Sequence, residues 1–238
     1  MNTTQITILA DLGLAAPMHF EPKLVCAQIV NASADVALLR VRGPEPYDAI
    51  MTANEYYEGR PFTVGAVLVL EQLSAPPRPT LSAVRPELVA MLLDGPVPEV
   101  RSGTVQVMDV ARQPGERAKV AVASTEEGVD PVASCVGRGA NRVKSVIELL
   151  GGERVDVVSW HPDAATYLRN ALAPAAVRAV HIDLDRRRAV VVAPAHTMPA
   201  AVGNHGLNAS LAGRLVGLRV QVVPEGADPE AVLASNEW

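Results

Sequence analysis

Cysteine and aromatic residues are scarce in this chain of 238 residues, which has two cysteines and 3% aromatic residues. Two cysteines cannot build the framework of a disulfide-stapled domain, and Cys26 and Cys135 lie far apart without a metal-ligand spacing. We expect two reduced, packed thiols. Because alanine, valine and leucine carry most of the 49% apolar fraction, the cores should be small-residue packings of helices and strands.

Long apolar runs and a basic leader are also missing. No apolar stretch approaches the roughly 18 residues of a membrane span. The N-terminal sequence MNTTQITILADLGLAAP has no basic residue ahead of its short apolar segment. These absences predict a soluble, cytoplasmic protein with no membrane partner, and the length allows two or three small domains.

An excess of positive charge is absent, since 21 basic residues face 26 acidic ones and the formal net charge is −5. This balance argues against a non-specific polyanion binder, which needs a broad basic surface. Residues 1–80 carry 5 basic against 8 acidic residues, residues 81–160 carry 9 against 11, and residues 161–238 carry 7 against 7. A local basic track remains open and belongs in the middle and C-terminal parts.

Residues 21–80 contain short β-branched runs separated by turn residues, LVCAQIV, ADVALLRVR, YDAIM and PFTVGAVLVLEQL. Four or five short strands in about 60 residues predict a small antiparallel barrel of the OB type. Residues 1–20 show no clean period and are expected to form a tail, and the proline-rich residues 74–80 mark a domain boundary. The few rings of this region either offer stacking surfaces to a ligand or cap the barrel core: Tyr47, Tyr56, Tyr57 and Phe62.

The rest of the sequence contains an internal repeat. Superposing Gly137 on Gly203 aligns VGRGANRVKSVIELLGG with VGNHGLNASLAGRLVGL. Each copy is expected to run as two strands, a short helix, a glycine turn, a second helix and a third strand, which makes the fold class α+β. We place the first copy at residues 81–172, the second at residues 173–224 and a C-terminal tail at residues 225–238.

The glycine turn of each copy is the candidate functional element. In the second copy, Gly203 and Gly206 bracket two polar residues, so a ligand can approach the backbone closely and meet the N–H groups that open the next helix. A GxxG turn of this kind clamps about four nucleotides of single-stranded RNA in KH domains. The alternative is an ordinary tight turn between two helices.

The ordered sequence around both turns resembles the bacterial NusA family of transcription elongation, termination and antitermination factors. The resemblance is carried by LSAVRPELVAMLL, VPEVRSGTVQVMDVARQPGERAKVAVAS, VDPVASCVG, LLGGERVDVVSW, ALAPAAV and AVGNHGLNASLAGRLVG. It covers about residues 80–222 strongly and residues 21–80 weakly. It implies an OB-fold domain followed by two tandem type II KH domains, each a three-stranded sheet with helices on one face. The implied partners are single-stranded RNA, RNA polymerase and other transcription factors, with no cofactor.

The site residues follow from this resemblance position by position. Asn204 and His205 stand where the family usually has an Arg-Glu pair, and Ala140 stands where the first KH domain has its closing glycine. The methyl group of Ala140 should weaken RNA binding by the first turn. The residues implied to bind RNA are Gly203, Asn204, His205, Gly206, Asn208, Gly137, Arg138, Gly139, Arg142 and Lys144.

Other functions fit the sequence less well. Lys119 and Arg214 are expected to be ordinary surface charges. The histidines after residue 160 have no i,i+4 pair and no nearby cysteine, so we expect no metal site, and no motif indicates an enzyme. About 20 residues cannot supply the N-terminal polymerase-binding domain of the family. An RNA-binding regulatory paralogue that does not contact polymerase, or a protein-interaction scaffold with degenerate turns, is therefore the alternative.

Overall fold

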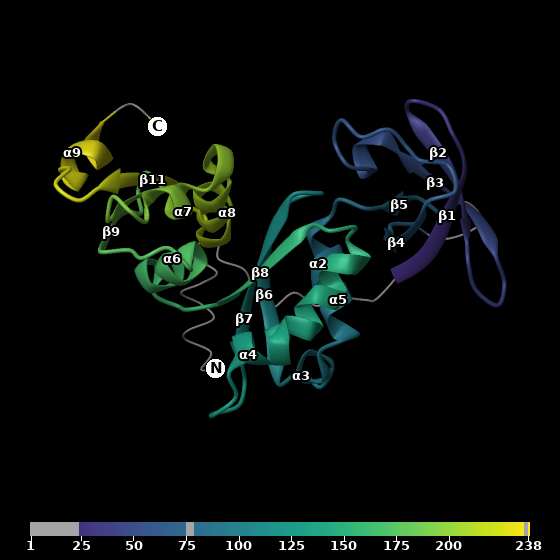
Figure 1. Ribbon diagram of the computed structural model, residues 1–238, viewed down its shortest axis with the longest axis horizontal. Coiled ribbons are helices and arrows are strands. Elements are labelled where there is room, and N and C mark those ends of the chain that lie inside the picture. Colours follow the sequence, from purple (N-terminus) through teal and green to yellow (C-terminus); the bar gives the residue numbers. More distant parts are fainter. Residues whose placement is uncertain (1–23, 75–78, 236–237) are drawn as a thin grey trace.

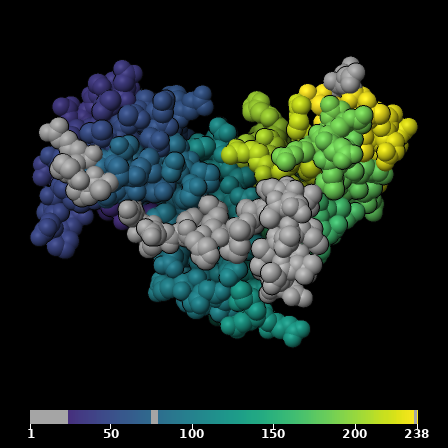
Figure 2. Space-filling view, turned by 180° about the vertical axis from the view of Figure 1, so that it is seen from behind, coloured from purple at the N-terminus to yellow at the C-terminus, as the bar shows by residue number. Residues whose placement is uncertain are grey.

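The computed structural model of the protein describes residues 24–74, 79–235 and 238. Three units follow one another along the molecule: a β-barrel, a first repeat unit and a second repeat unit (Figure 1). Seen from behind, the barrel and the second repeat unit lie on opposite sides of the first (Figure 2). The expected N-terminal tail, residues 1–20, and most of the proline-rich connector lie outside the described residues.

The barrel is a five-stranded sheet in the order β3-β2-β1-β4-β5, with antiparallel neighbours. A parallel bridge between Ile50 and Thr80 brings the two edges of this sheet together, so that the sheet nearly closes. Strand β2 shows why it forms, because its residues alternate between buried and exposed positions. The expected OB-like barrel is thus confirmed. Its elements are β1 (Leu24–Ala32), β2 (Val36–Val41), β3 (Tyr47–Thr52), a 3-10 turn (Ala53–Glu55), β4 (Val67–Gln72) and β5 (Leu81–Ser82).

The rings of the barrel pack against its core. All four are partly buried beside a cluster that includes Ile29, Leu39 and Met51. Tyr56 lies against Phe62 with ring centroids 4.8 Å apart. This packing favours the core-capping alternative over open stacking surfaces. The rings are those of Tyr47, Tyr56, Tyr57 and Phe62.

The first repeat unit has a three-stranded sheet in the order β6-β7-β8, in which β6 and β7 are antiparallel and β7 and β8 are parallel. Proline opens several of its helices, where its missing N–H costs nothing. The Asp130 side chain caps α4 by accepting the backbone N–H groups of Val132 and Ala133. The elements are α2 (Pro86–Asp94), α3 (Pro98–Arg101), β6 (Val105–Gln113), β7 (Arg117–Ser124), α4 (Pro131–Val136), a 3-10 turn (Arg138–Ala140), α5 (Asn141–Leu149) and β8 (Arg154–Ser159).

The second repeat unit repeats this architecture with the sheet order β11-β10-β9, where β10 pairs antiparallel with β9 and parallel with β11. Residues 225–238, expected as a tail, contain helix α9. The elements are α6 (Ala164–Leu172), β9 (Ala179–Asp183), β10 (Arg188–Ala193), α7 (Met198–Val202), a 3-10 turn (Asn204–Gly206), α8 (Leu207–Val216), β11 (Arg219–Pro224) and α9 (Pro229–Ala234). Helix α6 lies within the range expected for the first copy, but it packs with α8 and is therefore assigned to the second unit.

The two repeat units share one apolar core. One face of the first sheet packs on α2, α4 and α5, while Met108, Ala121 and Val158 on its other face pack against Leu168 of α6 and Leu211 of α8. Helices α6 and α8 of the second unit therefore lie between the two sheets. Helix α9 covers the far face of the second sheet through Leu233. None of the described helices is long and apolar enough to cross a bilayer.

Candidate nucleic-acid interface

The two glycine turns have the same backbone shape, residue for residue. Gly137 (φ 73°, ψ 170°) and Gly203 (φ 75°, ψ 174°) open them in a conformation that essentially only glycine adopts. Ala140 (φ 61°, ψ 24°) and Gly206 (φ 78°, ψ 5°) close them in the left-handed helical region. The superposition inferred from the sequence repeat therefore matches the backbone geometry.

The third position of each turn is also left-handed, with φ 61° at Gly139 and φ 50° at His205. Each turn thus places one side chain in the left-handed region, Ala140 in the first and His205 in the second. The first turn has lost the closing glycine but gained one at the third position. The number of unfavourable left-handed residues is consequently the same in both turns.

The opening glycine of each turn is required for packing, whereas the later glycines, Gly139 and Gly206, face open space. A Cβ atom added to Gly203 would lie 2.7 Å from the backbone nitrogen of Asn208, and one added to Gly137 would lie 2.7 Å from Cγ of Arg142. A Cβ atom at Gly206 would meet no atom within 4 Å among the residues compared. The first glycine of each turn therefore lets the next helix pack closely. Gly139 and Gly206 have open space at their Cβ positions among the residues compared, whereas Ala140, the fourth residue of the first turn, packs against the core of the first unit.

Several residues implied to bind RNA lie on this outward side. Arg138, Asn204 and His205 are exposed at the tips of the turns. Lys144 is exposed one turn into α5, and its Nζ donates to the carbonyl of Gly139 at 3.1 Å. Its charge thus lies beside the first turn.

Arg142 instead makes contacts within the first repeat unit. Its Nη1 lies 2.8 Å from Oε2 of Glu99 and donates to the carbonyl of Ser134 at 2.6 Å. The Glu99 carboxylate accepts a hydrogen bond from the backbone of Glu99 itself, and this bond, together with the Arg142 contact, holds the pKa of Glu99 below its ordinary value. The Glu99 carboxylate therefore balances the guanidinium charge, and Arg142 ties α3 to α4.

Asn208 is buried behind the second turn and forms hydrogen bonds to the helix that precedes it. Its side chain is 1% exposed, and its Nδ2 donates to the carbonyls of Ala200 and Ala201 at 3.1 Å each. These bonds join the start of α8 to the end of α7, so Asn208 holds the two helices that flank the turn.

A groove of about 490 Å³ lies between the second turn and the first repeat unit. Gly203 and Asn204 line one side, and Arg117 and Arg154 line the other from the first residues of β7 and β8. These two arginines are direct neighbours in the parallel register of the strands. Sequence reasoning missed both, although a signal existed, because Gly-Glu-Arg occurs at residues 115–117 and again at residues 152–154.

Two of the cations beside this groove contact the same carboxylate, that of Asp156. Nη2 of Arg117 lies 2.6 Å and Nζ of Lys119 lies 3.0 Å from Oδ2 of Asp156. Burial holds the pKa of Lys119 below its ordinary value, and the Asp156 charge opposes this shift. With the exposed Arg154 and with Glu116, which also lines the groove, three cations face two carboxylates, so this edge of the first sheet carries a net charge of one positive unit.

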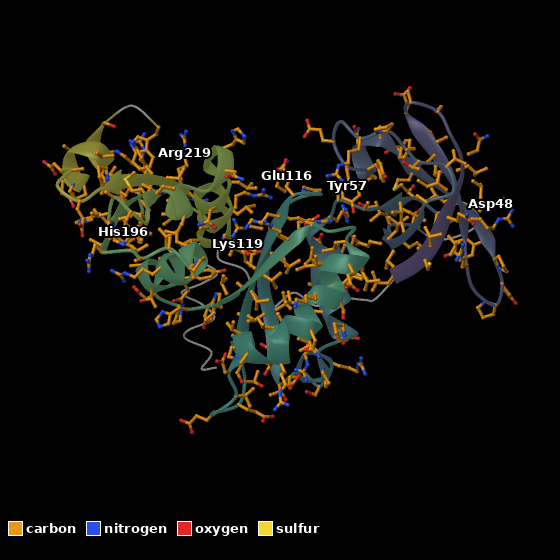
Figure 3. The ribbon with its side chains drawn as sticks, viewed as in Figure 1. Asp48, Tyr57, Glu116, Lys119, His196 and Arg219 are labelled. Atoms are coloured by element: carbon orange, nitrogen blue, oxygen red, sulfur yellow. The ribbon has the colours of Figure 1, made fainter. Side chains whose placement is uncertain are left out.

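The prediction that Lys119 is a surface charge is wrong, because its side chain is fully buried where the second repeat unit covers the first sheet. Arg214 is exposed as expected. Figure 3 shows Lys119 on the side of the first unit that faces the second, while His196 lies on the far side of the second unit. The described residues contain no group of three or more histidine, cysteine, aspartate or glutamate side chains that could hold a metal ion.

Comparisons with known proteins match both repeat units. Residues 84–160 match the family model of the NusA-like first KH domain, and residues 164–230 match that of the NusA-like second KH domain. Proteins named transcription termination/antitermination protein NusA are similar to the chain: 33% identical over 184 residues in Halalkalibacterium halodurans, 33% over 172 in Bacillus subtilis and 39% over 151 in Mycobacterium tuberculosis.

These alignments cover 77%, 72% and 63% of the chain but only 48%, 46% and 44% of those relatives. The chain therefore spans about half the length of the relatives that it matches.

Proposed function

Because this chain is a NusA-like protein that carries both KH domains of that family, we propose that it binds single-stranded RNA and acts in transcription elongation, termination or antitermination. The observation that carries the proposal is the pair of turns with one backbone shape, the second of which opens onto a groove lined by Arg117 and Arg154. Backbone N–H groups at the turn hold the sugar-phosphate chain, and the arginines pair with phosphates.

The proposed action is binding without catalysis. Every group assigned to RNA is a backbone amide, a cation or a neutral polar side chain, and these groups position a phosphate chain without transferring a proton or an electron pair. The protein acts in the cytoplasm, where nascent transcripts are made, with RNA polymerase as its protein partner. Co-purification of polymerase with the tagged chain tests this partner separately from RNA binding.

RNA binding is tested by placing two carboxylates at the second turn. The variant combines Asn204→Asp with His205→Asp, both at exposed positions of the turn. Two negative charges beside the phosphates should lower the affinity for single-stranded RNA at least about tenfold at low salt.

The matched control combines Ala195→Asp with His196→Asp. Both residues are exposed on the same unit, neither lines the groove, and the pair adds the same number of carboxylates. The control should bind RNA like the wild type. Equal losses of affinity in both variants would show that the overall charge of the protein, and not the second turn, determines RNA binding. A wild type that binds no RNA at low salt would overturn the proposal in favour of a protein-interaction scaffold.

A further inference from the structure

All three units of the molecule meet at the turn between β6 and β7, residues 113–117, called here the β6–β7 turn. At its base lies an ion pair between Arg112 and Glu153, and both side chains are completely buried. Two hydrogen bonds join the groups, Nε to Oε1 at 2.7 Å and Nη2 to Oε2 at 2.9 Å. Such a two-point contact fixes the orientation of the guanidinium as well as its distance.

The remaining polar atoms of this pair hold the surrounding backbone. Oε2 of Glu153 also accepts the backbone N–H of Gly115 at 2.7 Å, and Nη1 of Arg112 donates to the carbonyl of Arg85 at 2.9 Å. Burying two charges is costly unless the rest of their hydrogen-bonding capacity is used, as it is here. The pair thereby fixes the β6–β7 turn against the residue that precedes helix α2.

The barrel contacts this turn through two side chains. Nη2 of Arg60 donates to the carbonyl of Gly115 at 3.2 Å, and the Tyr57 ring packs beside the same residue. Figure 3 shows Tyr57 close to Glu116 where the barrel meets the first unit. A Cβ atom on Gly115, whose φ is +78°, would lie 3.2 Å from the Tyr57 ring and 3.3 Å from the Arg60 guanidinium. The contact is thus close enough to depend on glycine.

The second repeat unit contacts the turn from the other side. Nη1 of Arg214 donates to the backbone carbonyl of Arg112 at 2.8 Å. Arg214 belongs to helix α8, whose first residue, Leu207, directly follows the second glycine turn. The position of Arg112 is therefore coupled through one rigid helix to the position of that turn.

We propose that Arg112 and Glu153 are positioning residues, which hold the β6–β7 turn so that the barrel and the second glycine turn keep a fixed geometry relative to the first repeat unit. The proposal rests on the proposed RNA binding. An RNA long enough to reach both KH domains gains affinity only if the two sites are held at a distance and an angle that it can span. A short RNA that occupies one domain gains nothing from this geometry.

Arg214→Met tests the link to the second unit without disturbing the buried pair. Two oligoadenylates serve as probes, one of about 5 nucleotides, which fills one KH domain, and one of about 15, which reaches both. Wild type should bind the longer RNA much more tightly. The variant should bind the shorter RNA like the wild type. Its ratio of affinities for the longer and the shorter RNA should be at least about fivefold smaller than that of the wild type. Arg214→Lys should restore the preference, because an ammonium group still donates to the carbonyl.

Arg169→Met is the matched control, since Arg169 is an exposed arginine on α6 of the same unit. It should leave the preference unchanged. An unchanged preference in Arg214→Met, or an equal loss in the control, would overturn the positioning role while leaving RNA binding intact. Failure of wild type to bind either RNA would instead overturn the proposed function.

The pair itself is tested by replacing both members together, with Arg112→Met and Glu153→Leu. Removing one partner alone would strand a buried charge, whereas two apolar residues of similar volume keep the core filled. This double variant should fold, as judged by its circular dichroism and unfolding midpoint, and should lose the preference for the longer RNA. Retention of the full preference by the folded double variant would refute the proposal.

The barrel side is tested with Gly115→Ala against Gly128→Ala. Both glycines have positive φ, +78° and +82°, so alanine costs similar backbone strain at either position. Only the alanine at residue 115 would press on Tyr57 and Arg60, because among the described residues compared no atom lies within 4 Å of the Cβ position at Gly128. Small-angle X-ray scattering should show a changed radius of gyration for Gly115→Ala alone. Identical profiles for both variants would refute the role of the turn in placing the barrel.

Discussion

Alanine substitutions at the two glycines of the second turn should separate stability from RNA affinity. Gly206 has φ +78° and open space around its Cβ position. An alanine in the left-handed region costs about 1–2 kcal/mol, and the smaller entropy of the unfolded chain returns about 0.4–1 kcal/mol. Gly206→Ala should therefore lose about 1 kcal/mol of unfolding free energy. Ala140, which already occupies the corresponding position of the first turn, shows that alanine fits this backbone shape.

Gly203→Ala should be much more damaging to the fold. Its φ of 75° and ψ of 174° belong to a region that costs a non-glycine residue about 1–3 kcal/mol. The new Cβ would also lie 2.7 Å from the backbone nitrogen and from Cβ of Asn208, so the first turn of α8 must shift. That shift strains the bonds from Asn208 to the end of α7, each worth about 1 kcal/mol. We expect a total loss of about 3 kcal/mol or more.

RNA affinity should follow the opposite order when it is measured on folded protein. The methyl group of Gly206→Ala points into the open space where the sugar-phosphate chain approaches, so the affinity for single-stranded RNA should fall about tenfold. Urea unfolding gives the stability of each variant, and fluorescence anisotropy with a labelled RNA gives its affinity at a temperature where it is folded. Equal losses of stability at both positions would refute the steric argument. Unchanged RNA affinity in Gly206→Ala would refute the outward orientation of the fourth position.

Two further substitutions probe strain in the first turn and an unpaired polar group in the shared core. Ala140→Gly removes a left-handed alanine but also a methyl group that packs against the core of the first unit, so it should raise stability by only about 0.5 kcal/mol; a loss of stability in urea unfolding would contradict the strain at this position. Tyr167 is 1% exposed, burial raises the pKa of its hydroxyl, and that hydroxyl has no hydrogen-bond partner among the described residues. Tyr167→Phe should therefore raise the unfolding free energy by about 1 kcal/mol, and a clear loss in thermal unfolding would reveal a hidden partner of the hydroxyl.

Local sequence patterns were sufficient for the parts of the fold that depend on neighbouring residues. The glycine turns, their repeat and the order of helices and strands are encoded within short segments, and the short β-branched runs of the barrel region form its strands. The same kind of signal precedes α9, since Asp228 and Pro229 repeat the Asp-Pro start of α4, and Asp228 caps the helix. Residues 225–238 were nevertheless predicted to be a tail.

Features that depend on distant residues could not be predicted from the sequence. Lys119 is buried because helices from the other repeat unit cover its side of the sheet, and no pattern within β7 reveals that cover. Arg142 and Asn208 occupy positions that match the family motif, yet their contacts lie within the protein. The pairing of Arg112 with Glu153 joins residues 41 positions apart in the sequence. Such contacts are set by packing between elements rather than by local spacing.

Helices α6 and α8 pack against both the first and the second sheet, and this arrangement makes each repeat unit depend on the other for the burial of apolar surface. A gene carrying only the first unit would leave Met108 and Val158 facing water, whereas a gene carrying only the second would uncover the sides of α6 and α8 that meet the first sheet. Either unit alone would therefore expose apolar surface that the other unit covers. Helix α9 covers the other face of the second sheet, so that face is closed to a further copy packed in the same way.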